Sequence, residues 1–278
     1  MPNIQLPPVF RFAPSPNGHL HLGHAYSALL NEKLAHEAGG KLLLRIEDVD
    51  RQRSRPEFEA AIIDDLNWLG IQFHDAPRRQ SDNLQLYQDA LDMLCFRGFA
   101  YPSAFSRSEI AALAATNSEW PRDPDGAFLP PVLVHEPAKL GGDHAIRFNM
   151  KTALQSCNVP IEWQEAGKMN QFDASLWGDI VLKNRDNSFA YHLAVVVDDA
   201  AQGVTNVVRG RDLFAATAIH RVLQNVLGFK APRYVHHDLM LDDKGNKLSK
   251  SERSPTLQSL RAAGMSARQL RLQLGFSA

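Results

Sequence analysis

The order of apolar segments near the start of the chain constrains the fold more than any other sequence feature. Val9–Ala13 is typical of a strand, and the prolines within Pro14–Gly18 end it because each fixes φ and removes a backbone donor. A helix is expected from about Leu22 to Ala38, ended by two glycines, and Lys41–Ile46 then resembles a buried strand. Apolar residues at helical spacing follow, namely Phe58, Ile62, Leu66 and Leu69. This strand–helix–strand–helix order predicts a parallel sheet covered by helices.

The rest of the chain contains an irregular stretch and then a second regular one. Leu84, Tyr87, Leu91 and Leu94 mark an amphipathic helix, after which prolines and glycines crowd the segment from about 98 to 177. Regular apolar patterns return at Phe189–Val197 and Val204–Val208, followed by a helix near Leu213–Leu227 and a strand-like piece at Arg233–Leu239. We therefore predict an α/β protein with a doubly wound parallel sheet and an inserted subdomain. Residues 1–97 and 178–240 form the two halves of one domain, 98–177 the insertion, and 241–278 a loop with a short helical tail.

Composition excludes several classes of protein. The chain is 44% apolar and 22% charged, as in an ordinary globular protein, and it has no run of about 18 apolar residues that could span a membrane. Its two cysteines, Cys95 and Cys157, exclude a disulfide framework. The first residues lack a basic segment followed by an apolar core, so we expect a cytoplasmic rather than a secreted protein.

Charge is distributed unevenly along the chain. From Asn206 to Ala278 there are 12 Lys and Arg against 5 Asp and Glu, a net of +7, whereas the whole chain carries −1. A basic C-terminal third on an acidic body suits a polyanionic ligand. Chance clustering of solvated charge is the alternative.

The most specific local pattern is His21-Leu-Gly-His24, at the expected start of a helix that follows a strand and a proline-containing turn. A helix N-terminus presents unsatisfied N–H groups and a positive dipole end, which suit phosphate. Histidines three residues apart lie on one face of the first turn, and Gly23 leaves room for a flat base. Surface histidines without a role are the alternative.

A second pattern, Lys247-Leu-Ser-Lys-Ser251, follows a turn-rich stretch, Asp242–Asn246. Two flexible ammonium groups in a mobile loop can close over a pyrophosphate leaving group and release it afterwards. Taken alone the pattern also fits a charged loop tip, but its combination with the histidine pattern favours nucleotide chemistry.

Six motifs in order carry a resemblance to a known family. The two patterns above look like the HIGH and KMSKS signatures of class I aminoacyl-tRNA synthetases, and four more match the glutamyl subgroup: Arg11–Pro16, Leu44–Arg51, Ala190–Asp199 and Val208–Asp212. The resemblance implies a Rossmann-like nucleotide-binding catalytic domain in which 98–177 is a connective, acceptor-binding insertion. It also implies activation of L-glutamate by ATP, with Mg²⁺, and transfer of the glutamyl group to a tRNA.

The resemblance also assigns residues to the two small substrates. For ATP and catalysis these are His21, Gly23, His24, Lys247 and Lys250, with the histidines stabilising phosphoryl oxygens and the lysines holding the β and γ phosphates. For glutamate they are Arg11, Ala13, Ser15, Glu47, Tyr191 and Arg209. Two carboxylates and one ammonium suit two guanidiniums and one acid, from Arg11, Arg209 and Glu47. The residue types do not decide which arginine takes which carboxylate.

The outline of the chain suggests a particular acceptor. Synthetases that charge the 3′ end of a tRNA carry a large C-terminal anticodon-binding region, and only 27 residues follow Ser251 here. This outline resembles the glutamyl-queuosine tRNA(Asp) synthetases, which attach glutamate to the base queuosine in the anticodon of tRNA(Asp). The resemblance implies queuosine-containing tRNA(Asp) as partner and activation of glutamate without tRNA. We also expect no membrane association and a monomer.

One departure from that family concerns zinc. Its usual members have a zinc site in the insertion that begins Cys-x-Cys, and this chain has Ser103 and Phe105 at the corresponding positions. Neither side chain is an effective zinc ligand, so we expect no zinc. Zinc would require other ligands, such as His135 or His144.

Three alternatives remain open. A glutamyl-tRNA synthetase charging a tRNA 3′ end is disfavoured by the missing C-terminal region. A small-molecule adenylyltransferase is disfavoured by the glutamate-pocket residues and the lysine loop, although some of those enzymes also use H-x-G-H. An inactive tRNA-binding paralogue is disfavoured by the intact histidines and lysines of the two signatures.

Overall fold

The structure is a computed structural model, and it describes residues 6–103, 105, 107–115, 119–129, 144–240 and 255–277. Contacts divide the chain into two compact units. The sheet unit comprises Met1–Asp82, Gln202–Leu213 and Pro232–Ala278, and the helical unit comprises Asn83–Ala201 and Phe214–Ala231. No helix in the described part of the chain is long and apolar enough to cross a membrane.

The described part of the sheet unit is built on five parallel strands in the order β10-β9-β1-β2-β3. These are β1 (Val9–Phe12), β2 (Lys41–Ile46), β3 (Arg78–Arg79), β9 (Asn206–Gly210) and β10 (Arg233–His237). β2 and β3 extend the sheet on one side of β1, whereas β9 and β10 extend it on the other. The direction of winding therefore reverses between β1 and β9, which confirms the doubly wound parallel sheet predicted from the sequence.

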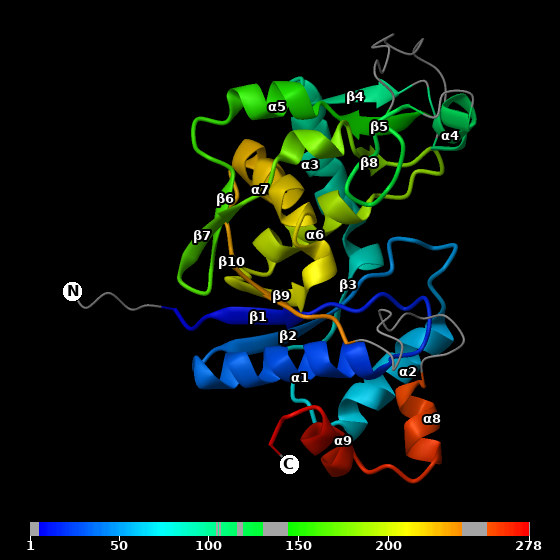
Figure 1. The fold of residues 1–278 in the computed structure, drawn as a ribbon, viewed down its shortest axis with the longest axis vertical. Coiled ribbons are helices and arrows are strands. Elements are labelled where there is room, and N and C mark those ends of the chain that lie inside the picture. The colour runs from blue at the N-terminus through cyan, green and yellow to red at the C-terminus, as the bar shows by residue number, and fades with distance from the viewer. Residues whose placement is uncertain are drawn as a thin grey trace, which may run out of the picture. The chain divides into compact units, whose positions relative to one another are not determined.

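The helix α1 (Leu22–Glu37) lies against one face of this sheet (Figure 1). On the same side are α2 (Pro56–Trp68), α8 (Leu257–Ala262) and α9 (Ala267–Gln273), of which α8 and α9 lie beyond α1. Two short 3-10 helices, η1 (Gln80–Asn83) and η3 (Arg211–Leu213), follow β3 and β9. The apolar core of the unit joins the strands to the helices through Phe10, Phe12, Leu42, Leu44, Leu29, Ile62, Leu66, Leu257 and Leu270. Burying each such side chain contributes about 1.5–3 kcal/mol, so this face of the sheet anchors the unit.

Local signals set the ends of the first elements. α1 ends where Gly39 takes a left-handed conformation, with φ of 57°, as the two glycines predicted. A Cβ at Gly40 would overlap the carbonyl of Pro8, so the chain enters β2 only because this residue has no side chain. Pro56 occupies the start of α2, where a missing N–H costs nothing.

The helical unit contains α3 (Leu84–Phe96), α4 (Arg107–Ala115), α5 (Met150–Ser156), α6 (Tyr191–Ala201), α7 (Ala216–Leu227) and the 3-10 helix η2 (Ala174–Trp177). An antiparallel sheet has the order β4-β5-β8, formed by Ala100–Ser103, Ala145–Phe148 and Val181–Lys183, and β6 (Glu162–Glu165) pairs with β7 (Lys168–Gln171) in a hairpin. The apolar segment 189–197, whose type the sequence left open, forms most of α6. The predicted domain limits, including the insertion 98–177, stay a proposal.

Candidate functional site

The predicted glutamate residues of the sheet unit gather at the carboxyl ends of its parallel strands. Arg11 is in β1, Glu47 directly follows β2, and Arg209 is in β9. Ligands of doubly wound sheets bind beyond these strand ends, at the point where the strand order reverses. In this sheet the strand order reverses between β1 and β9, which carry Arg11 and Arg209. The strand order therefore predicts a ligand site beside these two residues.

Strand alternation puts the charged residues on the face opposite the apolar core. Phe10, Phe12, Leu44 and Val208 belong to the core cluster that includes the covering helices. Their neighbours Arg11, Arg45 and Arg209 therefore face the other way, because successive side chains of a strand point to opposite faces. The guanidinium-bearing residues are nonetheless buried, with exposures of 4%, 0% and 6% respectively. Buried charge is tolerated only with partners, so these side chains are held by contacts within the protein rather than by solvent.

Glu47 is held by an arginine that sequence reasoning missed. Arg45 forms an ion pair with its carboxylate, with 3.1 Å between Nη2 and Oε1, and also donates to the side-chain oxygen of Gln202 at 3.0 Å. Residues two apart in an extended chain share a face, which is the only sequence signal that connects Arg45 to Glu47. The pair fixes the orientation of the carboxylate predicted to meet an ammonium group.

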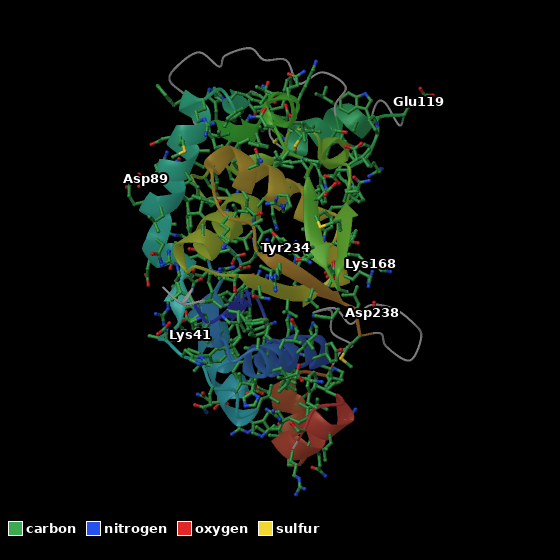
Figure 2. The ribbon with its side chains drawn as sticks, turned by 90° about the vertical axis from the view of Figure 1, so that its left-hand side faces the viewer. Lys41, Asp89, Glu119, Lys168, Tyr234 and Asp238 are labelled. Carbon is green, nitrogen blue, oxygen red and sulfur yellow. The ribbon has the colours of Figure 1, made fainter. Side chains whose placement is uncertain are left out.

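Arg209 is positioned by three neighbours. Its Nε donates to Nε2 of His236 at 3.3 Å, its Nη2 donates to the carbonyl of Leu213 at 3.2 Å, and its guanidinium lies 5.3 Å from the ring centre of Tyr234. The rings of Tyr234 and His236 are nearly parallel, with 2° between their planes and 5.9 Å between their centres. Tyr234 is labelled on β10 in Figure 2. Sequence reasoning missed both rings, because only the β9–β10 register places His236 opposite Arg209.

The turn after β1 carries Ala13 and Ser15, which are both half-buried. The amide of Glu47 donates to the carbonyl of Pro14 at 3.0 Å, and the amide of Arg55 donates to the carbonyl of Pro16 at 2.9 Å. The turn is thus tied to the end of β2 and to the start of α2. These bonds place Ser15 beside the strand end that carries Glu47.

The two signature histidines cap α1. Nδ1 of His21 accepts from the amide of Gly23 at 3.1 Å, and Nδ1 of His24 accepts from the amide of His21 at 3.2 Å. Their ring centres are 3.9 Å apart. A nitrogen that accepts a hydrogen bond carries no proton, so each neutral ring is protonated at Nε2. Both histidines therefore present an Nε2–H donor at a helix N-terminus.

The glycine between the histidines protects this arrangement. A Cβ at Gly23 would come within 3.0 Å of Cε1 and 3.2 Å of Nδ1 in the His21 ring. Any larger residue would press on the ring that caps the helix. The room that was predicted for a flat base is thus also room for the capping histidine itself.

Lys247 and Lys250 lie outside the described residues, but the segment that follows their loop is described. Thr256 pairs with His21 in an isolated antiparallel bridge, and the amide of Leu257 donates to the carbonyl of Leu20 at 2.9 Å. Thr256 and Leu257, which follow the lysine motif in sequence, therefore contact the residues at the histidine cap.

Tyr191 is the predicted glutamate residue that belongs to the helical unit, where it begins α6. It is half-buried, and its ring centre lies 5.3 Å from that of His192 and 5.7 Å from that of His220. Nδ1 of His192 lies 3.1 Å from Nε2 of His220. Arg11, Ser15, Glu47 and Arg209 belong to the sheet unit.

Ser103 occupies the position where the resembled family has a zinc-binding cysteine, and it takes part in a hydrogen-bond network. Its Oγ accepts from Nε of Arg147 at 3.2 Å, and Arg147 also donates to the carbonyl of Asp179 at 2.8 Å. The hydroxyl of Tyr101 donates to the Asp179 carboxylate at 2.6 Å, and burial together with this bond holds the pKa of Tyr101 well above its usual range. A guanidinium bonded to the serine does not suit a zinc cation. The absence of zinc stays a prediction, and His135 lies outside the described residues.

Comparisons with known proteins agree with this geometry. The family described as tRNA synthetases class I (E and Q), catalytic domain, matches residues 9–270. A glutamyl-Q tRNA(Asp) synthetase of Rhodobacter capsulatus is 43% identical, over 96% of this chain and 99% of its own length. A glutamate–tRNA ligase of Thermosynechococcus vestitus is 37% identical, over 91% of this chain and 54% of its own length.

The fold also resembles that of a solved structure. A glutamate tRNA ligase from Elizabethkingia meningosepticum, in complex with its amino acid, superposes with a TM-score of 0.71 at 27% identity. The match covers 93% of this chain and 53% of that one. The chain thus spans about half the length of the glutamate–tRNA ligases that it matches, but nearly all of the Rhodobacter capsulatus protein.

Proposed function

This chain belongs to the class I tRNA synthetases for E and Q, through their catalytic domain, and we propose that it activates L-glutamate with ATP and transfers it to queuosine in the anticodon of tRNA(Asp). The observation that carries the proposal is the buried polar face at the strand ends. It brings Arg11 and Arg209 to one sheet together with Glu47, and glutamate has the complementary charges. A glutamyl-Q tRNA(Asp) synthetase that the chain covers almost completely supports the choice of acceptor.

Within that site we assign the guanidiniums of Arg11 and Arg209 to the two carboxylates of glutamate and Glu47 to its ammonium group. The Arg45 ion pair keeps the Glu47 carboxylate oriented for this contact. Ala13 and Ser15 contribute the wall formed by the turn after β1. Tyr191 keeps the glutamate role that the family resemblance gives it. Because Arg209 is held by His236, Tyr234 and a backbone carbonyl, it meets a carboxylate without losing side-chain freedom at that moment.

The nucleotide is assigned to the N-terminus of α1. His21 and His24 offer Nε2–H donors to the phosphates, and the helix dipole favours the same negative charge. Lys247 and Lys250 would hold the β and γ phosphates, and Thr256, which follows them in sequence, pairs with His21. We propose that Mg²⁺ reaches the site on the ATP phosphates, whose charge it offsets.

The reaction then has two steps. An oxygen of the glutamate α-carboxylate attacks the α-phosphorus of ATP, the bond to the β-phosphate oxygen breaks, and pyrophosphate leaves with that electron pair. A hydroxyl of queuosine next attacks the carbonyl of glutamyl-adenylate, AMP leaves, and the hydroxyl proton goes to solvent or to the departing phosphate. Neither step requires a protein nucleophile, so positioning and charge stabilisation supply the catalysis. We further propose that the protein acts as a monomer in the cytoplasm.

The acceptor is tested with labelled glutamate and tRNA(Asp) isolated with and without queuosine. We expect label only on the queuosine-containing tRNA, none on tRNA(Glu), and nuclease digestion that leaves the label with an anticodon fragment. Label that remains with the 3′-terminal adenosine would replace this proposal with a glutamyl-tRNA synthetase. Glutamate-dependent exchange of pyrophosphate into ATP, measured without tRNA, separately tests the activation step.

A further inference from the structure

A hollow of about 360 Å³ opens in the sheet unit between the end of β2 and the start of α2. Its lining includes Pro16, Asp48, Arg51, Arg55, Glu59 and Ser81. Its volume is at the lower end of the range for small-ligand sites, which allows one nucleotide-sized group. None of these residues has a role in the activation chemistry proposed above.

The hollow adjoins the glutamate site through two backbone connections. Pro16 follows Ser15 in the turn after β1, and Asp48 follows Glu47 at the end of β2. The amide of Arg55 donates to the carbonyl of Pro16 at 2.9 Å, which closes the wall between the turn and α2. A group bound in the hollow would therefore contact Pro16 and Asp48, each of which directly follows a residue assigned to glutamate.

The carboxylates of the hollow are already satisfied within the protein. Asp48 accepts from the amide of Ser81 at 2.8 Å and from its hydroxyl at 2.6 Å. Glu59 accepts from Nε of Arg79 at 2.6 Å. These hydrogen bonds hold both carboxylates against the wall, and the ion pair with Arg79 offsets the charge of Glu59.

The arginines of the hollow, by contrast, face solvent. Arg51 is exposed, and no described residue forms an ion pair or hydrogen bond with its guanidinium. Arg55 has a side chain that is 63% exposed, and its contact with Glu57 is long, at 3.8 Å. Two exposed guanidiniums beside a nucleotide-sized hollow suit phosphate groups, which they bind in a planar, often bidentate geometry.

We propose that this hollow binds the nucleotide next to the acceptor in the RNA substrate, with Arg51 and Arg55 on its phosphodiester groups. The inference rests on the proposed function, because an acceptor nucleotide must reach the glutamyl group from a neighbouring site. Single-stranded RNA is recognised in this way, by phosphate contacts beside a pocket for one splayed-out nucleotide. The phosphates of ATP are assigned elsewhere, to the N-terminus of α1.

The test uses the full chain with Arg51 and Arg55 both changed to Gln, and Arg53→Gln as the matched control. Arg53 is in the same loop and its side chain is 73% exposed, but it pairs with Asp50 at 2.6 Å and does not line the hollow. Glutamate transfer to queuosine-containing tRNA(Asp) is measured as KM and kcat at several salt concentrations. Pyrophosphate exchange without tRNA and thermal unfolding are measured in parallel.

We expect the double variant to raise KM for the tRNA by roughly tenfold, the scale of one to two exposed charge-assisted contacts. The slope of log KM against the logarithm of the salt concentration should decrease by roughly 1.4, because each phosphate contact to a single strand contributes about 0.7. Exchange without tRNA and the unfolding temperature should stay at the parental values, and Arg53→Gln should match the parent throughout.

Three results would overturn the inference. A parental KM and salt slope in the double variant would show that the hollow does not hold RNA. A rise in KM for ATP during exchange would move the phosphate site to the nucleotide, and an equal loss in Arg53→Gln would indicate general surface charge. Failure of the proposed function is distinct, because the parent itself would then transfer no glutamate to the queuosine-containing tRNA.

Discussion

Asp65 makes the stability of the sheet unit depend on pH in an unusual direction. It lies in α2 with an exposure of 0%, and neither carboxyl oxygen has a hydrogen-bond partner among the described residues. Burial raises its pKa from 3.8 to about 6, the neighbouring Asp64 adds to the rise, and Arg261 opposes it. The group is therefore protonated in the folded protein under mildly acidic conditions and ionised in the unfolded chain.

The sign of the effect follows from proton binding. Between the unfolded value of 3.8 and the folded value of about 6, the folded protein holds a proton that the unfolded chain has released. Stability therefore falls as pH rises through this window. At about 1.4 kcal/mol per unit of pKa, the full cost above pH 7 is on the order of 3 kcal/mol. About 2 kcal/mol of it falls between pH 4.5 and pH 7.5.

The perturbation is Asp65→Asn, with Asp75→Asn as control because Asp75 is an exposed carboxylate of the same unit. Urea unfolding of both variants and the parent is followed from pH 4.5 to 7.5. The free energy of unfolding of Asp65→Asn, minus that of the parent, should rise by about 2 kcal/mol as the pH increases from 4.5 to 7.5. The buried amide adds only an offset that does not depend on pH. The control should show no such trend. A difference between Asp65→Asn and the parent that is independent of pH would refute the reasoning.

The remaining predictions concern the proposed ATP site and the position where the resembled family binds zinc. His24→Ala and Lys250→Ala should each lower glutamate-dependent pyrophosphate exchange by roughly 10²–10³-fold, the usual loss for one transition-state donor; exchange within about threefold of the parent in both would remove these roles. Protein purified without chelator should contain no stoichiometric zinc by elemental analysis, because Ser103 replaces a thiolate. Ser103→Ala should destabilise the helical unit by about 1–3 kcal/mol in urea unfolding, since it removes a buried acceptor of Arg147; unchanged stability would show that the network does not hold this unit.

The first elements could be predicted from sequence because nearby residues determine where each of them begins and ends. The helix expected from Leu22 to Ala38 is observed as Leu22–Glu37, and the strand expected at Val9–Ala13 is observed as Val9–Phe12. Proline turns and glycine ends act within a few residues, so no distant contact was needed to recognise them. Arg11, Glu47 and Arg209 were grouped by the family resemblance, and their strand ends lie at one edge of the parallel sheet, where such residues gather.

Residues that depend on strand register could not be recognised. Arg45 and His236 matter because each lies beside another strand-end residue, and neither belongs to an expected substrate contact. The pairing of β9 with β10 joins segments more than 20 residues apart, and nothing local to Arg233–Leu239 indicates which strand it will join. Segment 189–197 was left open for a related reason: a run apolar on every side has no periodicity that separates helix from strand.

The histidine pattern combines a structural and a chemical requirement in the same four residues. A capping box needs acceptors at the residue before the helix and three residues later, and His21 and His24 meet that spacing with their Nδ1 atoms. Serine and glutamate would cap equally well, but their acceptors would place an oxygen or a negative charge where we propose that phosphate binds. An imidazole that accepts through Nδ1 has its proton on Nε2, so the bond that caps the helix also selects the tautomer that donates to a phosphate. The spacing of the two histidines therefore matches helix capping, and their identity suits the phosphate ligand that we propose.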